Sequence, residues 1–164
     1  MFRFRPVTVV SLAFMAGSAG CGGSDDDAPT NDPSSTVSCT ADPRLDAYAG
    51  ELAKAGELGV LSFRFFDLDP APPARGLNTF HVQVSSAGGE VTPDQLEVDL
   101  RMPDHGHGTS VVPVISGDAA PGTYTVRQLF LFMPGVWRLD FEALGAGDDA
   151  SMLDSVTLHF CVEG

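Results

Sequence analysis

Residues 96–102 read Leu-Glu-Val-Asp-Leu-Arg-Met, an unbroken alternation of apolar and charged side chains. Side chains on a β-strand point to opposite faces in turn, so this pattern predicts a strand with one face in a core and the other in water. Residues 137–142, Trp-Arg-Leu-Asp-Phe-Glu, repeat the pattern. Both segments therefore favour a sheet that is buried on one side.

Further short segments show the same alternation and are separated by turn residues. Residues 111–115 add a strand that Pro113 places at a sheet edge, and the alternation breaks near Gln128. A Pro-rich turn is expected at 69–73 and a Gly-rich turn at 87–89. The remaining strands are expected at 61–65, 80–84, 124–132 and 156–160. About seven short strands predict an all-β, immunoglobulin-like two-sheet sandwich, with an open barrel as the alternative.

One short helix is expected ahead of the first strand. Asp42 would be its N-cap and Pro43 its first residue, and Gly56 would end it. Apolar residues recur along one side of this segment, at Leu45, Tyr48 and Leu52. We expect the helix to lie across the domain.

The N-terminus has the order of an export signal. Basic residues precede an apolar stretch, and the signal would occupy residues 1–20. The segment Ser-Ala-Gly-Cys at 18–21 resembles the lipobox of bacterial lipoproteins, which implies cleavage before Cys21 and lipidation of its sulfur. Simple secretion is the alternative. Gly22 in place of Asp favours an anchor in the outer membrane, facing the periplasm.

Residues 21–37 are rich in Gly, Ser, Asp and Pro and predict a disordered tether, which leaves 38–164 as the folded domain. This domain holds two cysteines, Cys39 and Cys161, in what would be an oxidising compartment. We expect them to form a disulfide between the first folded segment and the last strand. Two free thiols that bind a metal are the alternative.

The charge and the motifs exclude several functions. The formal net charge is −13, which disfavours nucleic acid as a partner and favours cations. The chain contains no Gly-x-Ser-x-Gly, no phosphate-binding glycine loop and no His-Glu-x-x-His, so we expect it not to be an enzyme.

About half of the chain, from about residue 58 to 142, resembles the YtkA-like domain family of small exported bacterial proteins, whose pattern is related to FixH-type proteins. The resemblance rests on residues 76–84, 102–108, Pro113, 122–124 and 130–137. The family's Met-Pro-x-Met-Gly-His-Gly is Met-Pro-Asp-His-Gly-His-Gly here, so His105 replaces a methionine. The resemblance implies a β-sandwich at the cell envelope and, by analogy only, copper handling.

The segment 102–108 carries the candidate metal ligands. Met102, His105 and His107 lie within six residues, and Met133 could join them from the Met-Pro-Gly turn. Thioether and imidazole donors together suit Cu(I), whereas imidazoles alone suit Cu(II) or Zn(II). His105 in place of methionine makes Cu(II) more competitive.

Each candidate ligand also has a simpler interpretation. Met102 continues the apolar face of its strand, and Met133 follows an apolar run, so both could be core residues. His105 and His107 could be ordinary exposed loop residues. His81 is a conceivable outer ligand but, like His159, it alternates away from the apolar face and is expected at the surface.

Two functions follow from these observations. The first is a non-catalytic envelope lipoprotein that binds copper through the 102–107 loop, with Met133, for buffering or transfer. The second is a metal-free interaction or accessory module that the lipid anchor holds at the membrane, where it contacts another envelope protein. Burial of the two methionines in separate parts of the core would favour the second.

Overall fold

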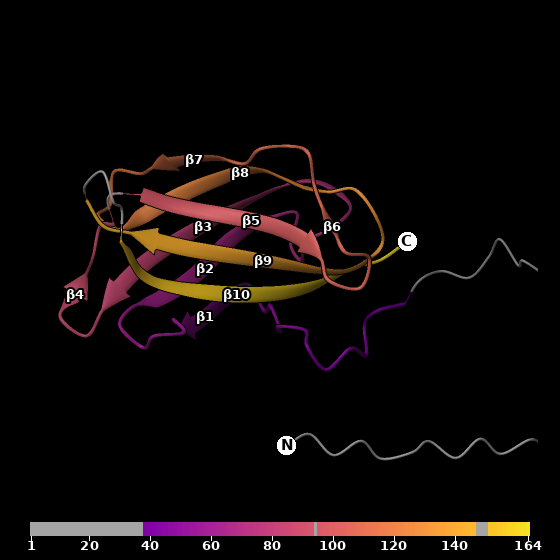
Figure 1. The fold of residues 1–164 in the computed structure, drawn as a ribbon, viewed down its shortest axis with the longest axis horizontal. Helices are drawn as coiled ribbons and strands as arrows, with labels where there is room; N and C mark the ends of the chain where they lie inside the picture. The colour runs from indigo at the N-terminus through magenta and orange to yellow at the C-terminus, as the bar shows by residue number, and fades with distance from the viewer. Residues whose placement is uncertain (1–37, 94, 147–150) are drawn as a thin grey trace, which may run out of the picture. The chain divides into compact units, whose positions relative to one another are not determined.

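The computed structural model describes residues 38–93, 95–146 and 151–164, and these form an all-β sandwich of two antiparallel sheets (Figure 1). The expected signal, Cys21 and the tether lie outside the described residues. The part of the chain that the structure describes holds no helix long and apolar enough to cross a membrane.

The first sheet has the strand order β1-β2-β3-β8-β7, and β4 pairs with β3. Strand β7 lies at the edge of this sheet, as the sequence predicts, but it begins at Val114, directly after Pro113, and not at residue 111. The bounds are β1 Glu51–Ala55, β2 Ser62–Asp69, β3 Gly76–Ser86, β4 Gly89–Glu90, β7 Val114–Gly117 and β8 Thr123–Leu131.

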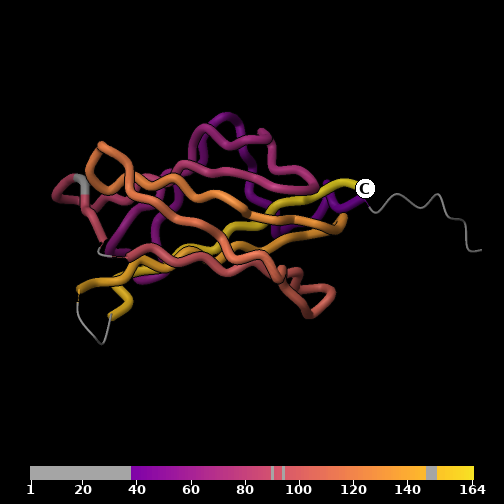
Figure 2. Tube along the Cα trace, turned by 90° about the horizontal axis from the view of Figure 1, so that it is seen from above, coloured from indigo at the N-terminus to yellow at the C-terminus, as the bar shows by residue number. Residues whose placement is uncertain are grey.

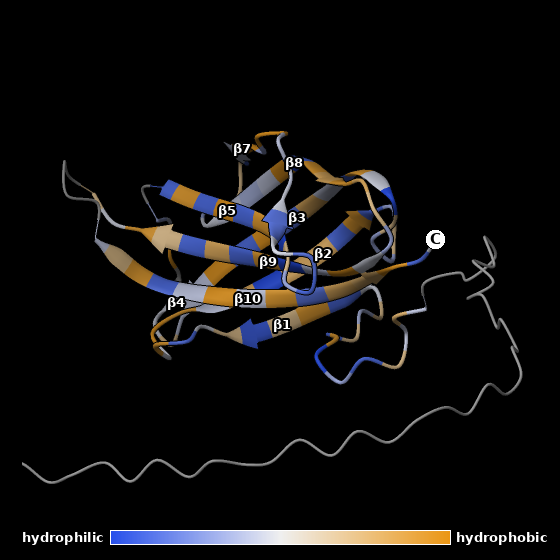
Figure 3. Ribbon diagram, turned by 45° about the vertical axis from the view of Figure 1, so that its right-hand side comes forward, coloured by the Kyte–Doolittle hydropathy of each residue, from blue (hydrophilic) through white to orange (hydrophobic). Residues whose placement is uncertain are grey.

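The second sheet has the order β10-β9-β5-β6. The two alternating segments of the sequence are neighbours in it, because Val98 pairs with Phe141 and Leu100 with Leu139. Its bounds are β5 Gln95–Met102, β6 His107–Gly108, β9 Gly135–Leu144 and β10 Met152–Val162. Apolar and polar residues alternate along these strands in Figure 3.

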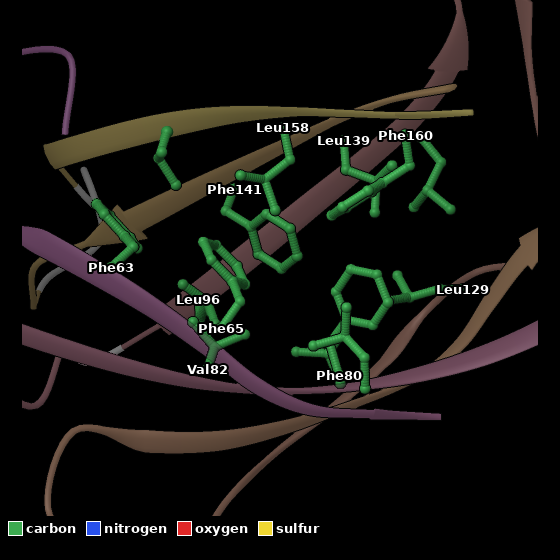
Figure 4. Close-up of a cluster of buried hydrophobic side chains, with 14 of the residues drawn as sticks. Phe63, Phe65, Phe80, Val82, Leu96, Leu129, Leu139, Phe141, Leu158 and Phe160 are labelled. Carbon is green, nitrogen blue, oxygen red and sulfur yellow. The ribbon is translucent and has the colours of Figure 1, made fainter. Parts of the chain in front are cut away.

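The core lies between the sheets, which Figure 2 shows as two layers of chain. Phenyl rings from opposite sheets meet there: Phe65 of β2 lies 5.0 Å from Phe141 of β9, and Phe80 of β3 lies 5.8 Å from Phe160 of β10 (Figure 4). All four rings are 4 % exposed or less. Aromatic pairs of this kind add to the hydrophobic stabilisation of the sandwich.

The predicted helix after Asp42 is wrong. The Asp42 side chain does accept a hydrogen bond from the Arg44 amide (2.9 Å), but Asp46 then bonds to the backbone of His159, which stops any helix from continuing. Gly50, with a φ of +89°, turns the chain into β1. Strand β1 pairs with β2 and supplies hydrogen-bond partners for the β2 backbone. This tertiary pairing outweighs helix propensity.

The irregularity near Gln128 is confirmed. Gln128 has a φ of +62°, and the register of β8 against β3 shifts between Asn78 and Phe80. A residue with positive φ in a strand interrupts the alternation of side chains, which is the signature seen in the sequence.

Asp154 is a buried charge that sequence reasoning missed. Its carboxylate is 0 % exposed and accepts hydrogen bonds from the amides of Leu58, Val60, Leu61 and Ser155, at 2.8–2.9 Å. Burial alone would raise the pKa of Asp154, but these bonds to the charged form outweigh it and the pKa is lowered. The carboxylate thereby holds the turn between β1 and β2 against β10.

The disulfide between Cys39 and Cys161 is confirmed, which rules out two free thiols as metal ligands. Cys161 lies opposite Val136 in β9, so the bond joins the first described residues to the end of the sandwich where β9 begins. The β6 loop and the C-terminus lie at this same end (Figures 1 and 2).

Candidate metal centre

A tight turn after β5 brings the two loop histidines back over Met102. The Met102 carbonyl accepts hydrogen bonds from the amides of His105 (3.2 Å) and Gly106 (2.9 Å). Gly106 has a φ of +70°, which glycine adopts without strain. The chain then returns as β6, where His107 pairs with Met102. Glycine in the loop is therefore what lets the three candidate side chains share one hairpin end.

Gly135 is the residue where this hairpin meets the rest of the domain. A Cβ built on Gly135 would lie 2.7 Å from Met102 Cε and 3.8 Å from His105 Nε2, so the terminal methyl of Met102 and the imidazole of His105 both lie next to Gly135. Gly135 also has a φ of +130°. A side chain here would displace Met102, and the absence of one leaves room for both groups.

The second loop histidine packs beside the first. The rings of His105 and His107 lie 5.8 Å apart at 53°. His107 stacks on Phe132 (5.7 Å, 26°), and Phe132 in turn meets Trp137 edge to face at 5.6 Å. A buried tryptophan thus supports the aromatic surface on which His107 rests.

The four candidate ligands differ in burial. Met102 is 0 % exposed and belongs to the core, as its place on the apolar face of the strand predicts, whereas His105 and His107 are exposed. Met133 is half-buried against the core, and its carbonyl oxygen accepts a hydrogen bond from the Trp137 indole (2.9 Å). The structure brings Met102, His105 and His107 together, with Met133 in the turn just ahead of Gly135.

The other two histidines have different surroundings. His81, on the outer face of the first sheet, contacts Thr125 and lies 3.6 Å from the Asp118 carboxylate. His159 lies beside the N-terminal segment, and burial lowers its pKa against the opposing effect of the Asp46 charge. Both are only half-exposed, because neighbouring side chains cover them.

An ion-pair network flanks the histidine loop, and no sequence signal pointed to it. The Arg44 guanidinium donates to the Asp104 carboxylate (2.9 and 2.7 Å) and to that of Asp42 (2.9 and 2.7 Å). Hydrogen bonds from Arg44 lower the pKa of Asp104 and hold that of Asp42 at about 2. Because Arg44 and Asp104 are 60 residues apart in sequence, spacing could not reveal this ion pair.

An open pocket of about 420 Å³ lies at this end of the sandwich. It reaches from the disulfide to the histidine loop, and its wall includes Cys39, Asp42, Asp104, His105, Gly135 and Val136. Solvent, and therefore a metal ion, can approach His105 here.

The donor set mixes nitrogen with thioether sulfur. Within residues 38–93, 95–146 and 151–164, no group of three or more His, Cys, Asp or Glu side chains could hold a metal ion. Two imidazoles and the Met102 thioether are donors of the kind that Cu(I) accepts. The carboxylate of Asp104, the residue before His105, is already paired with Arg44.

The comparisons with known proteins identify a family and nothing narrower. No curated protein and no solved structure matches the chain. The matched segment runs from the first residue of β2 into β9 and contains all four candidate ligands, whereas both disulfide cysteines and Arg44 lie outside it. Residues 62–142 match the family described as YtkA-like, so this chain carries a YtkA-like domain.

Proposed function

We propose that this protein is a non-catalytic cell-envelope lipoprotein whose YtkA-like domain binds copper, to buffer the metal or pass it on. The observation that carries the proposal is the convergence of Met102 Cε and His105 Nε2 at Gly135, with the His107 ring next to them. A net charge of −13 favours the approach of any cation.

Cu(I) is the oxidation state that we expect this site to prefer. Thioether sulfur is a soft ligand that Cu(I) accepts well, and imidazole serves either oxidation state. Cu(II) would use His105 and His107 without Met102. Met133 is the candidate for a further thioether ligand, because its turn leads directly into Gly135.

An anaerobic Cu(I) titration against a competing chelator tests the proposal. We expect one copper per protein, with weaker binding in His105→Ala, His107→Ala and Met102→Leu. Met133→Leu decides whether the second thioether contributes. His81→Ala and Met152→Leu are the matched controls, because they remove the same kinds of donor away from the loop. A folded wild type that binds no copper, or binding that only the control changes weaken, would overturn the proposal.

A metal-free interaction module is the second candidate, and a surface feature favours it. A pocket of about 470 Å³ beside the histidine loop is lined by Arg75, Phe130 and Phe132. Leu77 nearby is 61 % exposed, and it pairs with Phe130. Phe130 and Phe132 are half-buried, and apolar side chains that stay partly accessible together are typical of contact surfaces with other proteins. A folded protein without copper affinity would leave this function, with another envelope protein as the partner.

The envelope location is part of the proposal and has its own test. The lipobox resemblance at 18–21 and the Cys39–Cys161 disulfide both support an exported protein. We propose an anchor on Cys21 in the outer membrane, with the domain facing the periplasm. Cells fed an alkyne-labelled fatty acid should label the wild type and not Cys21→Ser, and only the wild type should fractionate with the outer membrane. Equal fractionation of both would contradict the anchor.

A further inference from the structure

Residues 38–46, which we call the strap, run along the end of the sandwich outside the segment that matches the family. The disulfide of Cys39 fixes one end of the strap to β10. At the other end, the Asp46 amide donates to the His159 carbonyl and the Asp46 carboxylate accepts from the His159 amide, both at 2.9 Å. The strap is thus held at both ends against the same strand.

Arg44 connects this strap to the histidine loop. Its guanidinium lies between the carboxylates of Asp42, on the strap, and Asp104, the residue before His105. Two parallel hydrogen bonds to each carboxylate fix the orientation of both partners, which an ammonium group could not do. A movement of the loop away from Gly135 would break the two bonds to Asp104.

We propose that Arg44 is a positioning residue for the metal site, because it holds His105 beside Gly135 through Asp104. The disulfide fixes the strap that carries Arg44 to β10. The inference deepens the proposed copper function and rests on it. Arg44 does not itself bind the metal, and its effect is to favour the loop position in which His105 and Met102 are together.

The charge of Arg44 and its positioning role have opposite effects on copper affinity. A cation near the site repels copper, so if Arg44 acted only through its charge, its loss would tighten binding. If Arg44 holds the loop, its loss weakens binding because His105 must be ordered when the metal binds. The sign of the change in affinity therefore separates the two roles.

The test compares Arg44→Gln with wild type in the protein purified as cells produce it, by anaerobic Cu(I) competition. We expect the dissociation constant to rise about threefold to fivefold, the upper part of the range for an exposed ion pair. Arg64→Gln is the matched control, because it removes the same charge from another exposed ion pair, with Glu51, on the first sheet. We expect wild-type affinity in this control.

A second variant separates the paired hydrogen bonds of the Arg44 guanidinium from its positive charge. Arg44→Lys keeps the positive charge, but it cannot make paired bonds to two carboxylates. We expect it to bind copper more weakly than wild type. Full wild-type affinity in Arg44→Lys, or unchanged or tighter binding in Arg44→Gln, would overturn the inference while leaving the proposed function intact.

A measurement on the metal-free protein makes the positioning visible. In protein labelled with ¹³C at the methionine methyls, the Met102 signal is assigned by its loss in Met102→Leu. Because this methyl lies against Gly135 beside the His105 ring, we expect Arg44→Gln to shift it and Arg64→Gln to leave it unchanged. An unshifted signal would contradict the positioning role. Absence of copper binding by wild type would instead overturn the proposed function, and this inference with it.

Discussion

Replacing Asp154 with Asn tests how far one buried carboxylate holds the N-terminal part of the sandwich in place. Asp154 Oδ2 accepts hydrogen bonds from the amides of Val60 and Leu61, and Oδ1 from those of Leu58 and Ser155. The asparagine amide is almost the same size but keeps only one oxygen. One pair of backbone amides would therefore face an NH₂ group instead of an acceptor.

The expected loss follows from the bonds that are broken. Hydrogen bonds to a charged group contribute about 1.5–3 kcal/mol, and two amides lose their acceptor, so we expect the free energy of unfolding to fall by about 3 kcal/mol. For a domain of this size that corresponds to a Tm lower by about 10 °C. Urea unfolding followed by the fluorescence of Trp137, the single tryptophan in the sequence, measures the change.

The pH dependence gives an independent check. Because the folded pKa of Asp154 is lowered, its stabilising contribution is fully present above the unfolded pKa of about 3.9 and is lost as pH falls through the folded pKa. The stability gap between wild type and Asp154→Asn should be constant above about pH 5 and shrink in acid. Asp99→Asn, on an exposed carboxylate, should cost less than about 0.5 kcal/mol. A gap below 1 kcal/mol at neutral pH, or one that does not shrink in acid, would refute this reasoning.

Three further changes have effects that the same urea assay can measure. Gly135→Ala should destabilise the fold by about 1–3 kcal/mol, since its φ of +130° disfavours a side chain and the new methyl would press on Met102; it should also weaken Cu(I) binding. Replacing Cys39 and Cys161 by Ser should cost about 4–5 kcal/mol, because the bond closes a loop with a sequence separation of 122, and a loss below 2 kcal/mol would contradict this. Gln128→Gly should add about 0.5–1 kcal/mol by removing the strain of a φ of +62°, and any loss of stability would count against it.

The strands could be predicted because one face of each is buried, and burial leaves a period of two in the sequence. This held for residues 96–102 and 137–142, which pair in the second sheet as β5 and β9. Even the break at Gln128 and the edge position of the strand after Pro113 left local signals. In each case the cause acts within a few residues along the chain.

The features that could not be predicted depend on contacts between distant segments. Helix signals around Asp42 were real local preferences, but pairing of β1 with β2 decided the outcome. Asp154 lies on the buried face of β10, two residues before Val156, but nothing in the sequence shows that amides of the turn between β1 and β2 would bind its carboxylate. Gly135 was expected as a turn residue, whereas the structure makes it the contact point for the hairpin that carries His105.

The candidate metal site was predicted in composition but not in arrangement. The segment 102–108 supplied three of the candidate donors within six residues. The support from Phe132 beneath His107, and from Arg44 beside His105, required the fold. The expected role of Met133 as a ligand stays a prediction.

X-ray absorption at the copper edge of the Cu(I)-loaded protein tests the central claim most directly, because it identifies the atoms bound to the metal. We predict a shell that contains both imidazole nitrogen and thioether sulfur, with the sulfur contribution reduced in Met102→Leu and the imidazole contribution reduced in His105→Ala. A shell of nitrogen and oxygen alone, unchanged in Met102→Leu, would contradict a site built at Gly135 from Met102, His105 and His107.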